Sequence, residues 1–138
     1  NVLSRGIVGA GTSFALKYRY DDAGRLTFVD EQTGASSTRR LKELGYGRVN
    51  VGDDKRAGKL VQAKRYNWLD LDPPTGDEAA TVTDRYVYAA AGGRISERQT
   101  RFHHDATSYA WSTGFDYDDL GNVSLLEYPR CRRRSGRA

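Results

Sequence analysis

YRYDDAGRLT, residues 18–27, is the first of three related segments in this chain. The other two are YVYAAAGGRIS, residues 86–96, and FDYDDLGNVS, residues 115–124. Each has an aromatic residue, any residue, a tyrosine, turn residues with a glycine, an arginine or asparagine, an aliphatic residue, and a serine or threonine. The tyrosine stands four residues before the first glycine that follows it. Repetition of this kind predicts an array of similar units that are stabilised by stacking on their neighbours.

Each segment has the pattern of a β-hairpin. Tyr18 and Tyr20 are two residues apart, so both lie on one face of a strand. The sequence DDAG, residues 21–24, is a turn signal in which aspartate bonds nearby backbone and glycine supplies a positive φ. Aliphatic and polar residues then alternate along the return strand. We assign the repeat motif to Tyr18, Tyr20, Asp21, Gly24, Arg25 and Leu26, to Tyr86, Tyr88, Gly92, Gly93, Arg94 and Ile95, and to Phe115, Tyr117, Asp118, Gly121, Asn122 and Val123.

This template resembles the tyrosine-aspartate repeat of the Rhs family, which includes bacterial Rhs proteins, the C component of insecticidal toxin complexes and the animal teneurins. The resemblance covers most of residues 18–129. The middle copy departs from the family pattern, because Ala89, Ala90 and Ala91 replace its acidic turn residues, so its turn need not match the others. A core segment that is associated with self-cleavage in larger Rhs proteins has no convincing match here.

The resemblance implies an all-β section of a curved or spiralling β-sheet shell, built from successive antiparallel hairpins. Such shells enclose a cargo, commonly a C-terminal toxin, and they act by confinement without catalysing a reaction. The implied partners are the rest of the parent polypeptide and its cargo. The parent is expected to be secreted or associated with the cell surface, although the localisation of this chain cannot be read from its termini.

The remaining sequence predicts the extent of the array. A fourth, eroded hairpin is expected from Val49–Val51 and a return arm that begins at Gly58, although it lacks an aromatic-x-Tyr arm. The hairpins then fall near residues 14–30, 47–68, 81–102 and 109–129, with six to eight strands in all. The repeat array occupies residues 1–129, and the arginine-rich residues 130–138 are a disordered tail or a truncated continuation.

Two segments permit more than one interpretation. Residues 1–12 contain Gly6, Gly9 and Gly11. This spacing differs from the dinucleotide-binding fingerprint, so we expect a glycine-rich link before the first hairpin. Residues 38–44, TRRLKEL, have a helical composition but are too short to be stable alone. The repeat context favours a strand there.

Composition restricts the class of protein. The chain has 138 residues, with 15 glycines, nine tyrosines and three prolines, which suits strands and turns and a single domain. No apolar run approaches the roughly 18 residues of a membrane helix, and no signal peptide is visible. The absence of methionine leads us to expect a fragment of a longer polypeptide.

The net charge of +4 comes from five arginines among residues 130–138, and the rest of the chain is close to neutral. A nucleic-acid partner is therefore not expected, because such proteins carry a basic surface. The single cysteine, Cys131, excludes an internal disulfide.

No residue pattern indicates catalysis, a metal or a cofactor. His103, His104 and Asp105 are the one place where acid–base or metal chemistry would be sought, but adjacent histidines on a strand point to opposite faces. The acidic loop at residues 70–80 lacks the ligand spacing of an EF-hand. The alternative to a structural role is a carbohydrate- or protein-binding module, with stacking surfaces supplied by Tyr66, Trp68, Tyr109 and Trp111.

Overall fold

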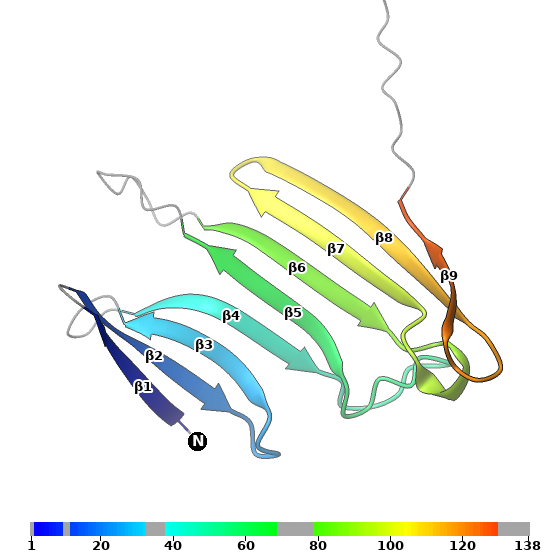
Figure 1. The fold of residues 1–138 in the computed structure, drawn as a ribbon, viewed down its shortest axis with the longest axis horizontal. Coiled ribbons are helices and arrows are strands. Elements are labelled where there is room, and N and C mark those ends of the chain that lie inside the picture. Colours follow the sequence, from blue (N-terminus) through cyan, green and yellow to red (C-terminus); the bar gives the residue numbers. More distant parts are fainter. Residues whose placement is uncertain (1, 10–11, 33–37, 69–78, 130–138) are drawn as a thin grey trace, which may run out of the picture.

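The computed structural model describes residues 2–9, 12–32, 38–68 and 79–129. In these ranges the chain forms one antiparallel sheet of nine strands, in which neighbouring strands follow one another in the chain (Figure 1). The all-β prediction of successive hairpins in a sheet is confirmed, with nine strands in place of six to eight. The strands are β1 Val2–Gly9, β2 Thr12–Tyr20, β3 Leu26–Gln32, β4 Thr38–Tyr46, β5 Leu60–Asn67, β6 Ala80–Val87, β7 Glu97–His104, β8 Thr107–Tyr117 and β9 Val123–Glu127.

The expectation of a link at the N-terminus was wrong. β1 pairs with β2 over its whole length, from Val2 opposite Arg19 to Gly9 opposite Thr12. Aliphatic residues with high strand propensity separate the glycines. The complete ladder with β2 compensates for the conformational freedom that Gly6 and Gly9 lose on ordering. The array therefore contains one more strand than the sequence suggested.

The fourth hairpin exists, but its first arm is β4. Residues 38–44 form a strand, as the repeat context favoured, and β4 pairs with both β3 and β5. The expected arm at Val49–Val51 was wrong, because these residues lie in the connection between β4 and β5 and both valines are exposed. The return arm is β5, as predicted. Tyr46, at the end of β4, is the template tyrosine that the sequence analysis overlooked.

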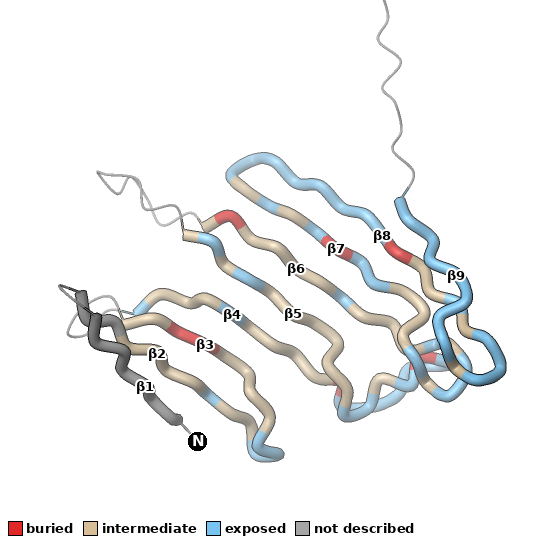
Figure 2. The backbone as a smooth tube through the Cα atoms, in the orientation of Figure 1, coloured by how far each residue is buried: buried red, intermediate tan, exposed pale blue. Residues whose placement is uncertain are grey.

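The sheet is a single layer with almost no hydrophobic core (Figure 2). Among the described residues, Val29 and Ala80 are the only buried apolar side chains, whereas Asp30, Asp54, Thr100 and Thr113 are buried polar ones. In the described part of the chain, no other layer covers either face. Stability must therefore come from strand pairing and from contacts between neighbouring hairpins.

Register separates the residues of β5 to β8 into two faces, because residues that are opposite each other in an antiparallel pair share a face. One face, which we call the polar face, carries the row Gln62, Arg85, Gln99 and Ser112 and the row Lys64, Thr83, Arg101 and Ala110. The other, the aromatic face, carries the row Arg65, Val82, Phe102 and Tyr109 and the row Ala63, Asp84, Thr100 and Trp111.

A buried carboxylate joins β2, β3 and β4. The Asp30 side chain on β3 forms ion pairs with Arg19 on β2 at 2.7 Å and with Arg40 on β4 at 3.0 Å. The Arg40 guanidinium also lies 4.0 Å from the centre of the Phe28 ring. The Asp30 side chain is buried, whereas both arginine side chains are partly exposed. Asp30 therefore joins three strands in a sheet with almost no hydrophobic core.

Candidate functional site

The hairpin turns share one pair of backbone hydrogen bonds. In the first turn the Asp21 N–H donates to the Arg25 carbonyl at 2.9 Å, and the Gly24 N–H donates to the Asp21 carbonyl at 3.0 Å. Asp118 and Gly121 repeat both bonds in the last turn, each at 2.9 Å. Gly24 and Gly121 have φ values of 75° and 87°, which L side chains rarely adopt.

The aspartate of the turn also organises the backbone with its side chain. Asp21 accepts the backbone N–H groups of Ala23 and Arg25 and the Arg25 Nε–H. Asp118 accepts the backbone N–H and the side-chain amide of Asn122. The Arg25 side chain lowers the pKa of Asp21, and the Asn122 side chain lowers the pKa of Asp118, because each donates to the ionised form.

In the middle copy the equivalent glycine is Gly93, not Gly92. The Gly93 N–H donates to the Ala90 carbonyl at 2.9 Å, and the Ala90 N–H donates to the Arg94 carbonyl at 3.3 Å. This is the same pair of bonds, and Ala89 is an additional residue between Tyr88 and the turn. Of the two glycines assigned to the motif, Gly93 is therefore the equivalent of Gly24, because Ala89 shifts the turn by one residue.

The β4–β5 hairpin keeps the same closing bonds around a long insertion. The Gly47 N–H donates to the Lys59 carbonyl at 2.9 Å, and the Gly58 N–H donates to the Gly47 carbonyl at 2.7 Å. Residues 48–57 lie between the two glycines. A Cβ atom at Gly47 would lie 2.2 Å from the Arg56 carbonyl oxygen. This close approach explains why a glycine replaces the usual aspartate.

Three of the hairpins are each joined to the preceding one by a tyrosine hydroxyl. Three hydroxyls donate to main-chain carbonyls: Tyr46 to Leu26 at 3.0 Å, Tyr88 to Leu60 at 2.6 Å and Tyr117 to Ile95 at 2.9 Å. Each acceptor lies two residues after a turn glycine, namely Gly24, Gly58 and Gly93. We call this contact, together with the cation described next, the tyrosine clasp.

A basic residue completes each clasp. Arg25, Lys59 and Arg94, which directly follow the turn glycines, place their charged groups 4.4, 4.7 and 5.4 Å from the ring centres of Tyr46, Tyr88 and Tyr117. The same side chains reach the next turn: Arg25 donates to the Gly58 carbonyl and Lys59 to the Gly93 carbonyl. In the last copy, Asn122 holds the position of the basic residue and Val123 the position of the residue whose carbonyl accepts the tyrosine hydroxyl.

The first aromatic residue of each template does not contact its counterparts in other copies. Register places Tyr18 opposite Val29, Tyr86 opposite Arg98 and Phe115 opposite Leu126. Tyr20 lies opposite Leu26, beside a bulge. The stacked ring pair in the described part of the sheet is Phe102 with Tyr109, whose ring centres are 6.4 Å apart. Burial raises the pKa of both Tyr86 and Tyr88.

The insertion at residues 48–57 packs against the next hairpin. Asp54 is only 7% exposed and accepts the Tyr88 backbone N–H at 3.0 Å and the Arg56 Nε–H at 2.8 Å. The Lys55 N–H donates to the Tyr88 carbonyl at 3.0 Å. Burial opposes ionisation of Asp54, but the Arg56 side chain and the Tyr88 N–H outweigh it and lower its pKa. The sequence gave no indication of this contact.

The structure places the two histidines of the histidine segment on different faces of one strand. His103 and His104 are neighbours on β7 and point to opposite faces, and His104 Nδ1 lies 3.4 Å from a carboxylate oxygen of the exposed Asp105. Across the described ranges no three histidine, cysteine, aspartate or glutamate side chains gather as metal ligands.

The four candidate stacking residues do not form one platform. Tyr66 lies on the polar face, where its hydroxyl donates to Glu43 at 3.1 Å, and the Trp68 indole N–H donates to the Arg40 carbonyl at 2.7 Å. Tyr109 and Trp111 lie on the aromatic face and are 61% and 39% exposed.

No protein-family model, curated protein or solved structure matches this chain. The described residues include no helix with the length and apolar character needed to cross a membrane. Residues 130–138, with Cys131, and most of the acidic loop at 70–80 lie outside the described residues.

Among the described features, the tyrosine clasp is the one that recurs between hairpins. The functional interpretation therefore depends on it.

Proposed function

We propose that this chain is a structural, non-catalytic section of a larger hairpin-repeat wall of the Rhs type, whose parent protein encloses a C-terminal toxin or other effector. The observation that carries this proposal is the tyrosine clasp, which joins one hairpin to the next with the same chemistry at three junctions. Contacts that recur with the period of the sequence repeat are typical of a scaffold that grows by adding units.

The shape of the sheet supports the same function. A single layer with two open faces suits a wall that separates an inside from an outside. The outer edge of β9 offers a site for a further hairpin. Val123 lies two residues after the turn glycine Gly121, which is the position of the carbonyl that accepts the tyrosine hydroxyl in the other copies. Exposed sheet edges invite pairing with another strand, and a wall built from many such hairpins would satisfy them internally.

Protease protection in the parent polypeptide tests this proposal. The coding sequence on both sides of the chain would be recovered and the whole parent produced. We expect further copies of the template and a C-terminal region that resists protease in the intact parent. That region should become sensitive in a Tyr46→Phe/Tyr88→Phe/Tyr117→Phe parent. Rapid digestion of the C-terminal region in the unaltered parent, or flanking sequence without any repeat, would refute the proposal.

A second candidate function is a carbohydrate- or protein-binding module at the cell surface. The observation in its favour is the exposure of Tyr109 and Trp111 on one face of β8, beside the stacked Phe102 ring. Aromatic faces of this kind stack on sugar rings or partner side chains. Glycan-array binding that is lost in Trp111→Ala and retained in Leu120→Ala would support this function, whereas a protein that binds no glycan would count against it.

A further inference from the structure

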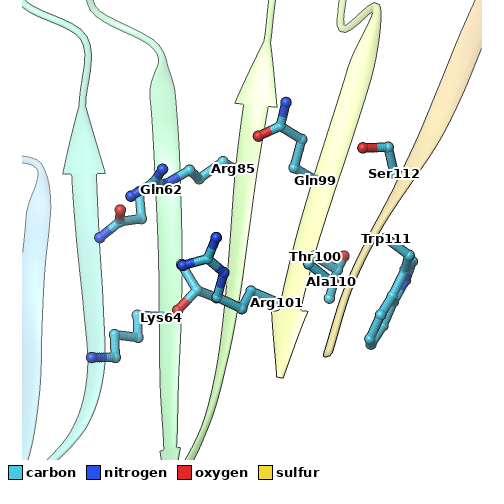
Figure 3. A pocket seen from close by; sticks show the side chains of 10 residues that line it. Gln62, Lys64, Arg85, Gln99, Thr100, Arg101, Ala110, Trp111 and Ser112 are labelled. Carbon is cyan, nitrogen blue, oxygen red and sulfur yellow. The ribbon is translucent and has the colours of Figure 1, made fainter. Parts of the chain in front are cut away.

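The polar face contains a groove that none of the tyrosine clasps involves. Most of its lining residues belong to the two polar-face rows, and Thr100 and Trp111 come from a row of the aromatic face. It has a volume of about 410 Å³ and crosses β5 to β8. Figure 3 shows six of its side chains, which come from all four strands: Gln62, Lys64, Arg85, Gln99, Arg101 and Ser112. Its size falls within the range of small-molecule sites. No aspartate or glutamate is among its lining residues.

Three basic residues line this groove. Lys64 and Arg101 lie in one cross-strand row with Thr83 between them, and Arg85 lies in the adjacent row. Diagonal neighbours on adjacent strands are about 7–8 Å apart. Figure 3 shows the Arg85 and Arg101 side chains reaching across the sheet toward Gln62 and Lys64. The Arg85 and Arg101 side chains therefore extend in the same direction over the groove, whereas the Lys64 ammonium group is directed toward β4 and lies over the Tyr66 ring.

The side chains of the two arginines lack the ion pairs that several other basic residues of the sheet form. Arg19, Arg25 and Arg40 each form an ion pair with an aspartate. In the described ranges, the side chains of Arg85 and Arg101 form neither an ion pair nor a hydrogen bond. Lys64 is partly compensated, because Glu43 lies directly opposite it in the register and its ammonium group lies 4.6 Å from the centre of the Tyr66 ring.

Adjacent unpaired cations on a sheet repel one another, so this arrangement lowers stability unless an anion occupies the space between them. Guanidinium groups bind carboxylate, phosphate and sulfate through paired N–H donors. The Gln62 amide and the Ser112 hydroxyl, in the row that contains Arg85, add uncharged donors. The Gln99 amide nitrogen donates to the Glu97 carboxylate at 3.3 Å. An acidic side chain therefore lies next to one of the groove's lining residues.

From this geometry we infer that the polar-face groove binds a small polyanion that carries two or three oxyanion groups. Arg85 and Arg101 each hold one group, and Lys64 holds a third once its ammonium group turns away from the Tyr66 ring. Binding exchanges repulsion between the cations for charge-assisted hydrogen bonds, so the ligand also stabilises the sheet. This inference is independent of the proposed wall function, because the site lies within β5 to β8 and requires no neighbouring unit.

Isothermal titration at low ionic strength tests the inference. The probes are citrate, inorganic tripolyphosphate and the trisulfated heparin disaccharide, which separate carboxylate, phosphate and sulfate as the source of the oxyanion. At least one probe is expected to bind with a submillimolar Kd and to raise the melting temperature. The Arg85→Gln/Arg101→Gln variant should bind that probe with an affinity lower by about tenfold or more. Without ligand, its melting temperature should be no lower than that of the parent.

The matched control is Arg65→Gln/Arg98→Gln. It removes the same charge from β5 and β7, but Arg65 and Arg98 lie on the aromatic face. The control should keep the affinity of the parent within about twofold. An equal loss of affinity in both variants would show that the probes respond only to net charge, and binding of no probe at millimolar concentration would equally overturn the site.

Discussion

Removing a single hydroxyl from the second clasp should measurably weaken the sheet. Tyr88→Phe leaves the aromatic ring in place beneath the Lys59 ammonium but removes the 2.6 Å bond to the Leu60 carbonyl. A hydrogen bond of this kind contributes about 0.5–1.5 kcal/mol, and leaving the carbonyl partly unsatisfied adds to the cost. We expect a loss of about 1–2 kcal/mol, which corresponds to a decrease of roughly 3–8 °C in Tm for a chain of this size.

Urea unfolding followed by tyrosine and tryptophan fluorescence would measure this loss. The matched control is Tyr109→Phe, because that hydroxyl belongs to a side chain that is 61% exposed. A cycle with Lys59→Met would isolate the cation–ring contribution, which should couple to the Tyr88 ring by about 0.5–1 kcal/mol in a Tyr88→Leu background. If Tyr88→Phe cost no more than Tyr109→Phe, the clasp would not stabilise the sheet.

Three further predictions follow from the turns and the buried carboxylates. Gly24→Val and Gly121→Val should each cost at least about 1–2 kcal/mol in urea unfolding, because both positions have a positive φ that a β-branched residue resists. At Gly121 a Cβ would also lie 2.0 Å from the end of the flexible Arg94 side chain, which can move aside. A pair of variants that unfold like the parent would contradict the turn assignment. The lowered pKa of Asp54 predicts a stabilisation that is present above its unfolded pKa of 3.8 and is lost as the pH falls through the folded pKa. The urea midpoint should therefore fall less between pH 5 and strong acid in Asp54→Asn than in the parent. Identical pH profiles of the two proteins would show that ionised Asp54 does not stabilise the fold. Asp30→Ala should cost about 2 kcal/mol, since it leaves Arg19 and Arg40 without their shared partner, and an unchanged thermal midpoint would show that the anchor is dispensable.

Much of the local structure was predictable because it depends on short-range chemistry. Alternating residues and Asp-x-x-Gly turns identify the β2–β3 and β8–β9 hairpins directly. Insertions prevented the same template from being recognised in full in the other two hairpins. Ala89 shifted the matching glycine to Gly93, and residues 48–57 separated Tyr46 from Gly58, so that no contiguous template remained to be read.

The clasps and the groove could not be predicted, because they depend on register between strands that are far apart in sequence. Tyr46, Tyr88 and Tyr117 bond carbonyls that lie 20, 28 and 22 residues earlier in the chain. The template shows that a tyrosine and a basic residue recur, but not that each tyrosine contacts the basic residue of the preceding unit. Likewise, Lys64, Arg85 and Arg101 meet only because three strand pairings place them on one face.

The most direct test of the central claim is an experimental structure of the parent polypeptide at a resolution that shows side chains. If the chain is a section of a continuing wall, a strand follows β9 and ends in a tyrosine whose hydroxyl lies within about 2.6–3.2 Å of the Val123 carbonyl oxygen. A β9 edge that is left open, or that is covered by a domain without such a tyrosine, would contradict it.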